Sequence, residues 1–204
     1  MAWNESEDAM NARLDRHYTL EDYFALEEQS EIRHEYDGRR VYAMTGASRQ
    51  HNRIVMRVSA SLFNQLGSGP CEVYPSDMRL KIEQYGMYTY PDLSVVCGPM
   101  ELTGDRLDTM TNPTLLIEVL SPSTERYDRG RKFEYYQTLE SLRAYLLISQ
   151  DHPRVELYLR RPDESWLLIY FTRLDQTIPL EPIGCSLSMA DIYAGVAFDE
   201  EPQP

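Results

Sequence analysis

Apolar residues recur along the chain with two different spacings, which predict where helices and strands lie. The longest helical pattern begins after Ser48 and runs to about Leu66, with apolar residues three or four positions apart. Thr19, followed three positions later by Asp22, predicts a second helix start that leads through Leu26. Both segments are therefore predicted to be helices, and a Gly-Ser-Gly-Pro run ends the longer one.

Short apolar runs rich in β-branched residues predict strands on both sides of the long helix. The predicted strands are residues 32–36, 40–44, 71–74, 78–82, 93–96, 115–120, 144–148, 155–159 and 166–171. Residues 99–113 predict a polar loop, and further helices are expected at about 128–139 and 189–193. This order of elements is typical of an α/β (α+β) fold, in which helices flank a central mixed β-sheet.

Length and composition are those of one ordinary globular domain. The chain has 204 residues, of which 42% are hydrophobic and 26% are charged. We expect a flexible N-terminal arm over residues 1–17, a single domain over 18–198 and an acidic tail over 199–204. No run approaches about 18 apolar residues, and the first residues are polar, so we expect a cytoplasmic protein that does not enter a membrane.

The net charge of −13 argues at first against a nucleic-acid binder, because such proteins neutralise phosphates with Lys and Arg. The acid is unevenly placed, however, and much of it lies in the N-terminal arm and the C-terminal tail. Arg126, Arg129, Arg131 and Lys132 fall within seven residues. A nucleic-acid ligand close to this basic segment is therefore not excluded by the overall charge.

The cysteines point to no metal site. Cys71, Cys97 and Cys185 lie far apart, their number is odd, and no C-x-x-C pair is present. We therefore expect all three to be reduced and mostly buried.

Two carboxylates at or inside apolar strands are the strongest chemical signal. Asp92 directly precedes the strand 93–96, and Glu118 lies inside the strand 115–120. A carboxylate in a buried strand is unfavourable unless it is paired, hydrogen-bonded or bound to a metal. Both are ligands that Mg²⁺ prefers, and Lys132 on the next helix would orient water or stabilise a phosphodiester transition state. The same pattern also fits two carboxylates that cap backbone amides at the ends of strands.

Several short segments between residues 18 and 160 make the interpretation more specific. They are Tyr18–Tyr23, His34–Tyr36, Tyr42–Ser48, Tyr74–Met78, Tyr90–Asp92, Glu118–Thr124 and Lys132–Phe133. These segments resemble the Uma-two family of restriction-endonuclease-like proteins, within the PD-(D/E)xK nuclease superfamily. The resemblance implies a restriction-endonuclease-like fold and a Mg²⁺-dependent DNA endonuclease, with Mn²⁺ as a possible substitute. It also implies that Asp92 and Glu118 bind the metal, and that Asp92, Glu118, Lys132 and Glu35 are catalytic.

Three positions depart from the superfamily or family pattern. Leu120 stands where the superfamily has its lysine, and Lys132 on the following helix takes that role, as is usual in this family. Arg39 stands where the family usually has glycine, so we expect a rebuilt first turn and a less secure place for Glu35. Ala144 stands where a glutamate is common, and a consequence at the surface is expected.

Other questions stay open at this point. Asp77 is either part of the site or a turn carboxylate, and His51 either approaches the site or is a partly exposed helix histidine. A non-catalytic module that keeps the nuclease fold to bind nucleic acid or protein is the alternative function, and RNA is an alternative substrate. We also expect a homodimer, because cutting both strands of a duplex needs two sites and residues 155–171 are rich in apolar side chains.

Overall fold

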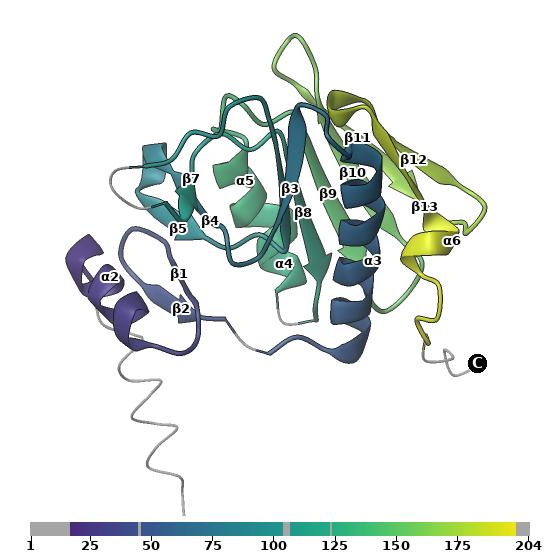
Figure 1. Cartoon of the computed structure of the whole chain (residues 1–204). Helices are drawn as coiled ribbons and strands as arrows, with labels where there is room; N and C mark the ends of the chain where they lie inside the picture. The colour runs from purple at the N-terminus through teal and green to yellow at the C-terminus, as the bar shows by residue number, and fades with distance from the viewer. Residues whose placement is uncertain (1–16, 45, 104–106, 123, 199–204) are drawn as a thin grey trace, which may run out of the picture.

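The computed structural model describes residues 17–44, 46–103, 107–122 and 124–198, and a six-stranded sheet lies at its centre (Figure 1). The strand order is β11-β10-β9-β8-β6-β3, and only β8 and β9 run parallel, so the central sheet is mixed as predicted. The strands are β3 (Cys71–Pro75), β6 (Leu93–Cys97), β8 (Leu115–Leu120), β9 (Ala144–Ser149), β10 (Val155–Arg160) and β11 (Trp166–Phe171).

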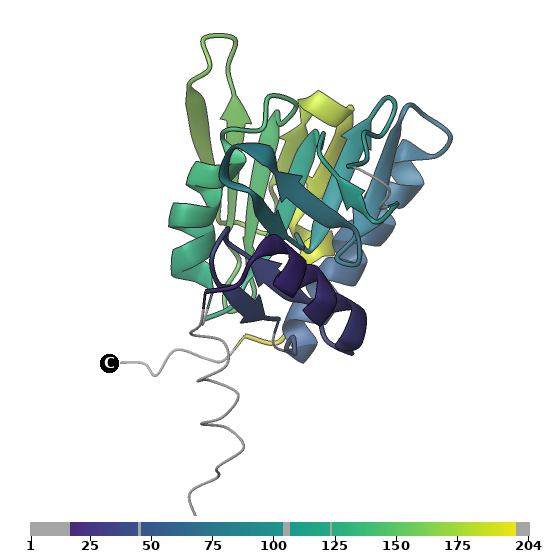
Figure 2. The same cartoon turned by 90° about the vertical axis from the view of Figure 1, so that its left-hand side faces the viewer.

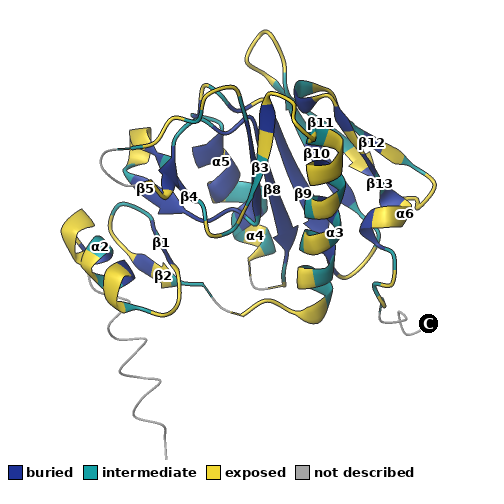
Figure 3. Cartoon of the chain, viewed as in Figure 1, coloured by how far each residue is buried: buried dark blue, intermediate teal, exposed yellow. Residues whose placement is uncertain are grey.

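Both faces of this sheet are covered. One face packs against α3 (Arg49–Leu66), the hairpin of β12 (Thr177–Leu180) and β13 (Cys185–Ser188), and α6 (Met189–Ile192). A helical segment covers the other face, and it consists of α4 (Glu125–Tyr127), a π-helical turn (Asp128–Lys132) and α5 (Phe133–Tyr136). Figure 3 shows β8 and β9 as buried throughout, whereas the outer side of α3 is exposed.

A second, five-stranded sheet lies beside the first, and α2 (Leu20–Gln29) packs on it (Figures 1 and 2). Its order is β2-β1-β5-β4-β7. Its strands are β1 (His34–Tyr36), β2 (Val41–Ala43), β4 (Arg79–Ile82), β5 (Met87–Thr89) and β7 (Thr109–Met110). Thr19 caps α2 through reciprocal hydrogen bonds with Asp22, as the sequence predicted.

Some elements differ from the sequence prediction. The helix expected over residues 128–139 begins at Glu125, passes through the π-helical turn and ends at Tyr136. The region 99–113 contains the short strand β7, and the hairpin of β12 and β13 was not predicted. Within the described ranges no helix is both long and apolar enough to cross a membrane. The expected arm up to residue 16 and the expected tail lie outside the described residues, so the division into arm, domain and tail stays a prediction.

The expectation of three reduced cysteines is wrong. Antiparallel pairing of β3 with β6 places Cys71 directly opposite Cys97, and the two form a disulfide across 26 residues of sequence. Cys185 is free and buried. The spacing of the cysteines gave no hint of this pair, because the partnership depends on the register of two strands.

Ala144 also corrects an expectation. Its side chain is 1% exposed and lies in the core between the sheet and α3, opposite Leu115 of β8. The alanine therefore fills the interior, and its consequence is not at the surface. A glutamate at this position would need a partner inside that core.

Candidate active site

Asp92 and Glu118 meet where the pairing of β6 and β8 stops. The ladder begins at Leu93, opposite Ile117, and Asp92 lies just outside it. The Asp92 carboxylate then takes the place of a backbone partner, because its Oδ2 accepts a 2.7 Å hydrogen bond from the amide of Val119. The amide of Asp92 lies 3.4 Å from Glu118 Oε2. The two acids predicted from the sequence are therefore neighbours across adjacent strands.

Alternation along β8 directs Glu118 toward the helical segment. Leu115, Ile117 and Val119 pack toward α3, whereas Leu116 and Leu120 pack toward the other face. Glu118 falls in the second set, under the π-helical turn. Its side chain is therefore buried in a region covered by protein on both sides of the sheet.

Lys132 lies at the centre of a cluster of acids. Its Nζ lies 2.8 Å from Glu118 Oε1, 3.0 Å from Glu35 Oε1 and 3.7 Å from Asp128 Oδ1. The lysine is only 5% exposed, and Glu118 and Asp128 are equally buried. The Lys132 ammonium thus forms ion pairs with three carboxylates, in a site that is largely closed to water.

The helical segment supplies three of these side chains at regular spacing. Asp128, Lys132 and Tyr136 are four residues apart, and all three reach the neighbourhood of Glu118. The Tyr136 hydroxyl donates a 2.9 Å hydrogen bond to Glu118 Oε1. The i, i+4, i+8 spacing was visible in the sequence. It did not show whether Tyr136 belongs to the site or only packs in the core. Tyr136 is the site residue that sequence reasoning missed.

The electrostatics favour a charged lysine. Burial opposes the ammonium, but the charges of Glu118 and Glu35 outweigh it and raise the pKa of Lys132 well above its usual range. Burial raises the pKa of Glu118 above its usual range, although the charge of Lys132 acts in the opposite direction. Burial likewise raises the pKa of Tyr136, so its hydroxyl keeps its proton and donates to Glu118.

Glu35 reaches the cluster from β1 in the second sheet. Besides Lys132, its Oε1 contacts the Thr89 hydroxyl and lies 3.4 Å from the Tyr90 amide. The turn after β1 uses Gly38 in the left-handed region, with φ of +89°. The turn accommodates Arg39 without removing Glu35 from the site, so the three acids Asp92, Glu118 and Glu35 gather at one place together with Lys132.

His51 and Asp77 have different positions. The His51 Nε2 lies 3.1 Å from Asp92 Oδ2, and its Nδ1 is buried with no hydrogen-bond partner in the part of the chain that the structure describes. The histidine thus approaches the site, because Ser48 caps the start of α3 at this point. Asp77 is 82% exposed and pairs with Arg33, away from the site. The reading of Asp77 as a surface turn carboxylate is the better one.

The oxygens of Asp92 and Glu118 fit a hard divalent cation. Asp92 Oδ1 makes no hydrogen bond among the described residues, and Glu118 Oε2 has only the 3.4 Å contact with the Asp92 amide. Mg²⁺ binds through one or two carboxylates and keeps several positions for water and phosphate. No three His, Cys, Asp or Glu side chains are grouped as a metal site within the described ranges. The carboxylate oxygens of Asp92 and Glu118 are therefore the donors suited to such a cation.

Comparison with known proteins gives consistent matches. The model of the Uma2 family, described as "Putative restriction endonuclease", matches residues 20–190. The uncharacterized protein slr1290 of Synechocystis sp. is 39% identical over 178 residues, which are 87% of this chain and 92% of the relative. The uncharacterized protein sll1609 of the same organism is 37% identical over 150 residues, which are 74% of this chain and 85% of the relative.

A solved structure has the same fold. It is described as a putative nuclease belonging to DUF820 from Anabaena variabilis, and it superposes with a TM-score of 0.72. The match covers 88% of this chain and 99% of the other, at 18% sequence identity. The chain therefore has the restriction-endonuclease-like fold that the sequence predicted.

Proposed function

Because the chain belongs to the Uma2 family, we propose that it is a Mg²⁺-dependent endonuclease that hydrolyses phosphodiester bonds of DNA. The observation that carries the proposal is the buried Lys132 ammonium, which lies 2.8 Å from Glu118 and 3.0 Å from Glu35, with Asp92 beside Glu118. A buried carboxyl with a raised pKa, that of Glu118, beside a buried lysine at the end of a strand is typical of a functional site.

Asp92 and Glu118 would hold the metal ion, which supplies Lewis-acid neutralisation of the phosphate and lowers the pKa of water. The protein's own groups position these ligands. Val119 and His51 fix the Asp92 carboxylate, and Tyr136 fixes that of Glu118. Lys132 would place its positive charge where negative charge develops on phosphorus oxygens, in a site from which water is largely excluded.

Glu35 has a second function in this proposal. Its Oε1 accepts from Lys132 and is also held by Thr89, so it faces the lysine from the opposite sheet. An acceptor at this position would orient an attacking water molecule that also contacts the ammonium. The site would then use Lys132 and Glu35 as a pair that positions the nucleophile.

The test is cleavage of supercoiled plasmid in Mg²⁺, in Mn²⁺ or in EDTA. We expect nicking that requires the metal, and no nicking by Asp92→Ala, because one of few hard ligands is lost. Lys132→Ala should cut roughly 10²–10³-fold more slowly, as when one preorganised donor is removed. Lys132→Arg should not restore the rate, because the guanidinium places its charge differently.

The control is Lys81→Ala. Lys81 is the other of the two lysines in the chain, and it pairs with the exposed Glu83. This variant should cut at the wild-type rate. A protein that binds plasmid but never cuts it, in either metal, would instead support the alternative of a non-catalytic module. The same reactions with an RNA substrate would distinguish the two kinds of nucleic acid.

A homodimer remains part of the proposal, but one of its two reasons is weaker. Leu157 packs toward the α3 side of the sheet, and Tyr158 and Trp166 pack toward the helical segment, whereas Tyr170 is 49% exposed. Three of the apolar side chains on which the homodimer was predicted therefore have partners within the chain. The remaining reason is that cutting both strands of a duplex requires two sites.

A further inference from the structure

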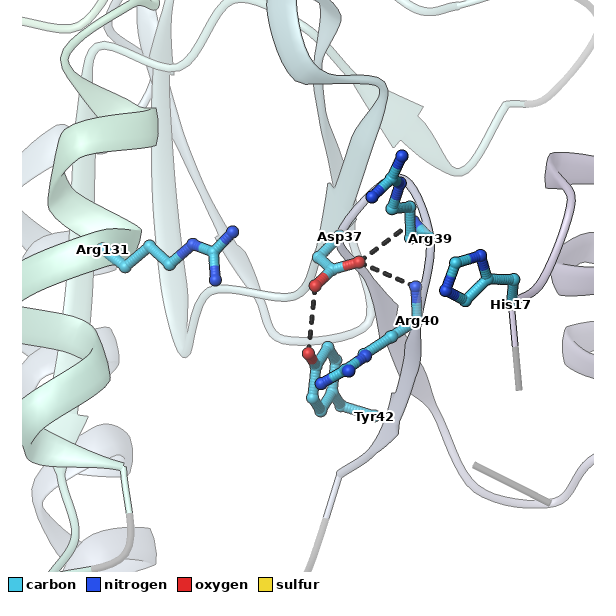
Figure 4. Close-up of a pocket in the computed structure, with 6 residues that line it drawn as sticks. All are labelled: His17, Asp37, Arg39, Arg40, Tyr42 and Arg131. Atoms are coloured by element: carbon cyan, nitrogen blue, oxygen red, sulfur yellow. Dashed lines mark hydrogen bonds between the residues drawn. The ribbon is translucent and has the colours of Figure 1, made fainter. Parts of the chain in front are cut away.

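A cleft of about 280 Å³ lies beside the candidate site and is lined mainly by basic side chains (Figure 4). Its lining residues are His17, Asp37, Arg39, Arg40, Tyr42 and Arg131. Arg131 approaches from the helical segment on one side, and His17 lies on the other side, with Asp37 between them. The cleft is therefore built from segments that are distant in sequence.

Most of the acceptor capacity of Asp37 is used by its own turn. Oδ1 accepts from the amides of Arg39 and Arg40 at 3.0 and 2.7 Å, and Oδ2 accepts from the Tyr42 hydroxyl at 3.0 Å. These bonds hold the Asp37–Tyr42 segment in shape. One carboxylate faces three arginines, so the cleft has an excess of positive charge in a chain whose net charge is −13.

Two of the arginines that line the cleft, Arg39 and Arg131, are suited to binding an anion. The Arg39 side chain makes no hydrogen bond or ion pair within the described ranges, and it is exposed. Arg131 donates through Nε to the Tyr135 hydroxyl and stacks over the Tyr135 ring, with its Cζ 5.5 Å from the ring centroid. Because Nε is occupied, this geometry directs the terminal nitrogens of Arg131 away from the helix and toward Asp37 (Figure 4).

The cleft and the candidate site share two structural elements. Arg131 directly precedes Lys132 in the π-helical turn, and Asp37 follows Glu35 by two residues. Tyr127 lies within electrostatic range of both groups, because Glu35, Lys132 and Asp37 all act on its pKa, which burial raises most. A strand of nucleic acid that enters the site would therefore carry its neighbouring phosphates past the cleft.

We propose that this cleft, through Arg39 and Arg131, binds a phosphate group of the nucleic-acid strand next to the one that is cut. The inference rests on the proposed nuclease function for the identity of the ligand. Guanidinium groups match phosphate oxygens with two parallel hydrogen bonds, which a point charge does not provide.

The phosphate has two possible sources, an internal phosphodiester or a 5′-terminal phosphate. The experiment measures binding of a fluorescent 20-base-pair duplex in EDTA, where no cleavage occurs, over a series of salt concentrations. One arm uses duplex with 5′-hydroxyl ends, and the other uses the same duplex with 5′-phosphates. The proteins are wild type, Arg39→Ala, Arg131→Ala and the control Arg161→Ala. Arg161 is an exposed arginine in the turn between β10 and β11.

Arg39→Ala and Arg131→Ala should each weaken binding about tenfold, and the slope of log affinity against log salt should fall by about one. Arg161→Ala should bind as wild type does. A loss seen in both arms assigns the cleft to an internal phosphodiester, and a loss seen only with 5′-phosphates assigns it to a strand end. Wild-type affinity and slope in both cleft variants would overturn the proposal.

Failure of the proposed function would look different. If wild type cuts plasmid but the cleft variants bind normally, only the cleft assignment is wrong. If wild type neither cuts nor binds DNA, inorganic phosphate is titrated while the arginine Nε–H signals are followed by NMR. Shifts of Arg39 and Arg131 at millimolar phosphate, absent for Arg161, would keep the cleft as a phosphate site. Their absence would overturn it.

Discussion

Replacing Lys132 by alanine should destabilise the metal-free protein strongly and in a pH-dependent way. The ammonium lies 2.8, 3.0 and 3.7 Å from the carboxylates of Glu118, Glu35 and Asp128. Removing this cation leaves the buried Glu118 and Asp128 and the half-buried Glu35 without its compensating charge, which typically costs about 3–5 kcal/mol.

The magnitude follows from the proton that must replace the lysine charge. The folded variant can restore the charge balance by binding one proton more than the wild type. Protonating a carboxyl whose unfolded pKa is about 4.3 costs about 3.7 kcal/mol at pH 7 and about 1 kcal/mol at pH 5, at 1.36 kcal/mol per pH unit. The folded variant binds more protons than its unfolded state, so its stability falls as pH rises above about 4.3.

The assay is thermal and urea unfolding of wild type and Lys132→Ala between pH 5 and 8 in EDTA. At pH 7 the variant should melt roughly 7–15 °C lower, since 1 kcal/mol corresponds to about 2–4 °C for a chain of this size. Magnesium ions should recover more stability in the variant than in wild type, because the cation supplies the missing charge. Lys81→Ala should stay within about 0.5 kcal/mol of wild type at every pH. Equal unfolding midpoints for Lys132→Ala and wild type from pH 5 to 8 would refute the charge-balance argument.

Three further outcomes are expected. In Tyr136→Phe, Glu118 loses one of its two donors. The variant should therefore lose about 1–2 kcal/mol of stability in urea unfolding, and its cleavage should slow less than that of Lys132→Ala. A cleavage rate equal to that of Lys132→Ala would contradict this ranking. Thiol titration of the unfolded protein should find one thiol before reduction and three afterwards. Reduction should lower the free energy of unfolding by about 3.5 kcal/mol, because the Cys71–Cys97 disulfide closes a long loop. Three thiols before reduction would show that the disulfide is absent. Light scattering at tens of micromolar should give twice the chain mass of 23.8 kDa, and a monomer mass would count against the homodimer.

Much of the fold could be predicted because the pattern of apolar residues is local. The long helix after Ser48 and the strands around Glu118 follow from spacing within each segment, and the structure places them within a residue or two of the prediction. The hairpin of β12 and β13 escaped prediction, since Pro179 and Pro182 interrupt its apolar pattern. The disulfide escaped because it depends on strand register, which the sequence does not display.

The candidate site was predictable in its residues but not in its contacts. Asp92 and Glu118 could be chosen because a charged group in or near an apolar strand is unfavourable unless it is paired or bound, and Lys132 because it lies on the next helix. That Glu35 would join them from another sheet depended on the resemblance, and no spacing indicates it. The role of Tyr136 and the approach of His51 to Asp92 required coordinates, because both depend on how a helix lies against the sheet.

The hydrogen bond from the Val119 amide gives Asp92 a structural role in addition to its proposed role as a metal ligand, and selection acts on the two roles separately. The carboxylate completes the pairing of β6 with β8, so a chain that lost the activity would still be selected to keep it for folding. Lys132 contributes to stability only through the acids around it and makes no hydrogen bond that completes a strand, so a chain that loses those acids no longer needs the lysine. Among related chains, the lysine together with Glu35 should therefore mark those that remain active, and the aspartate alone should not.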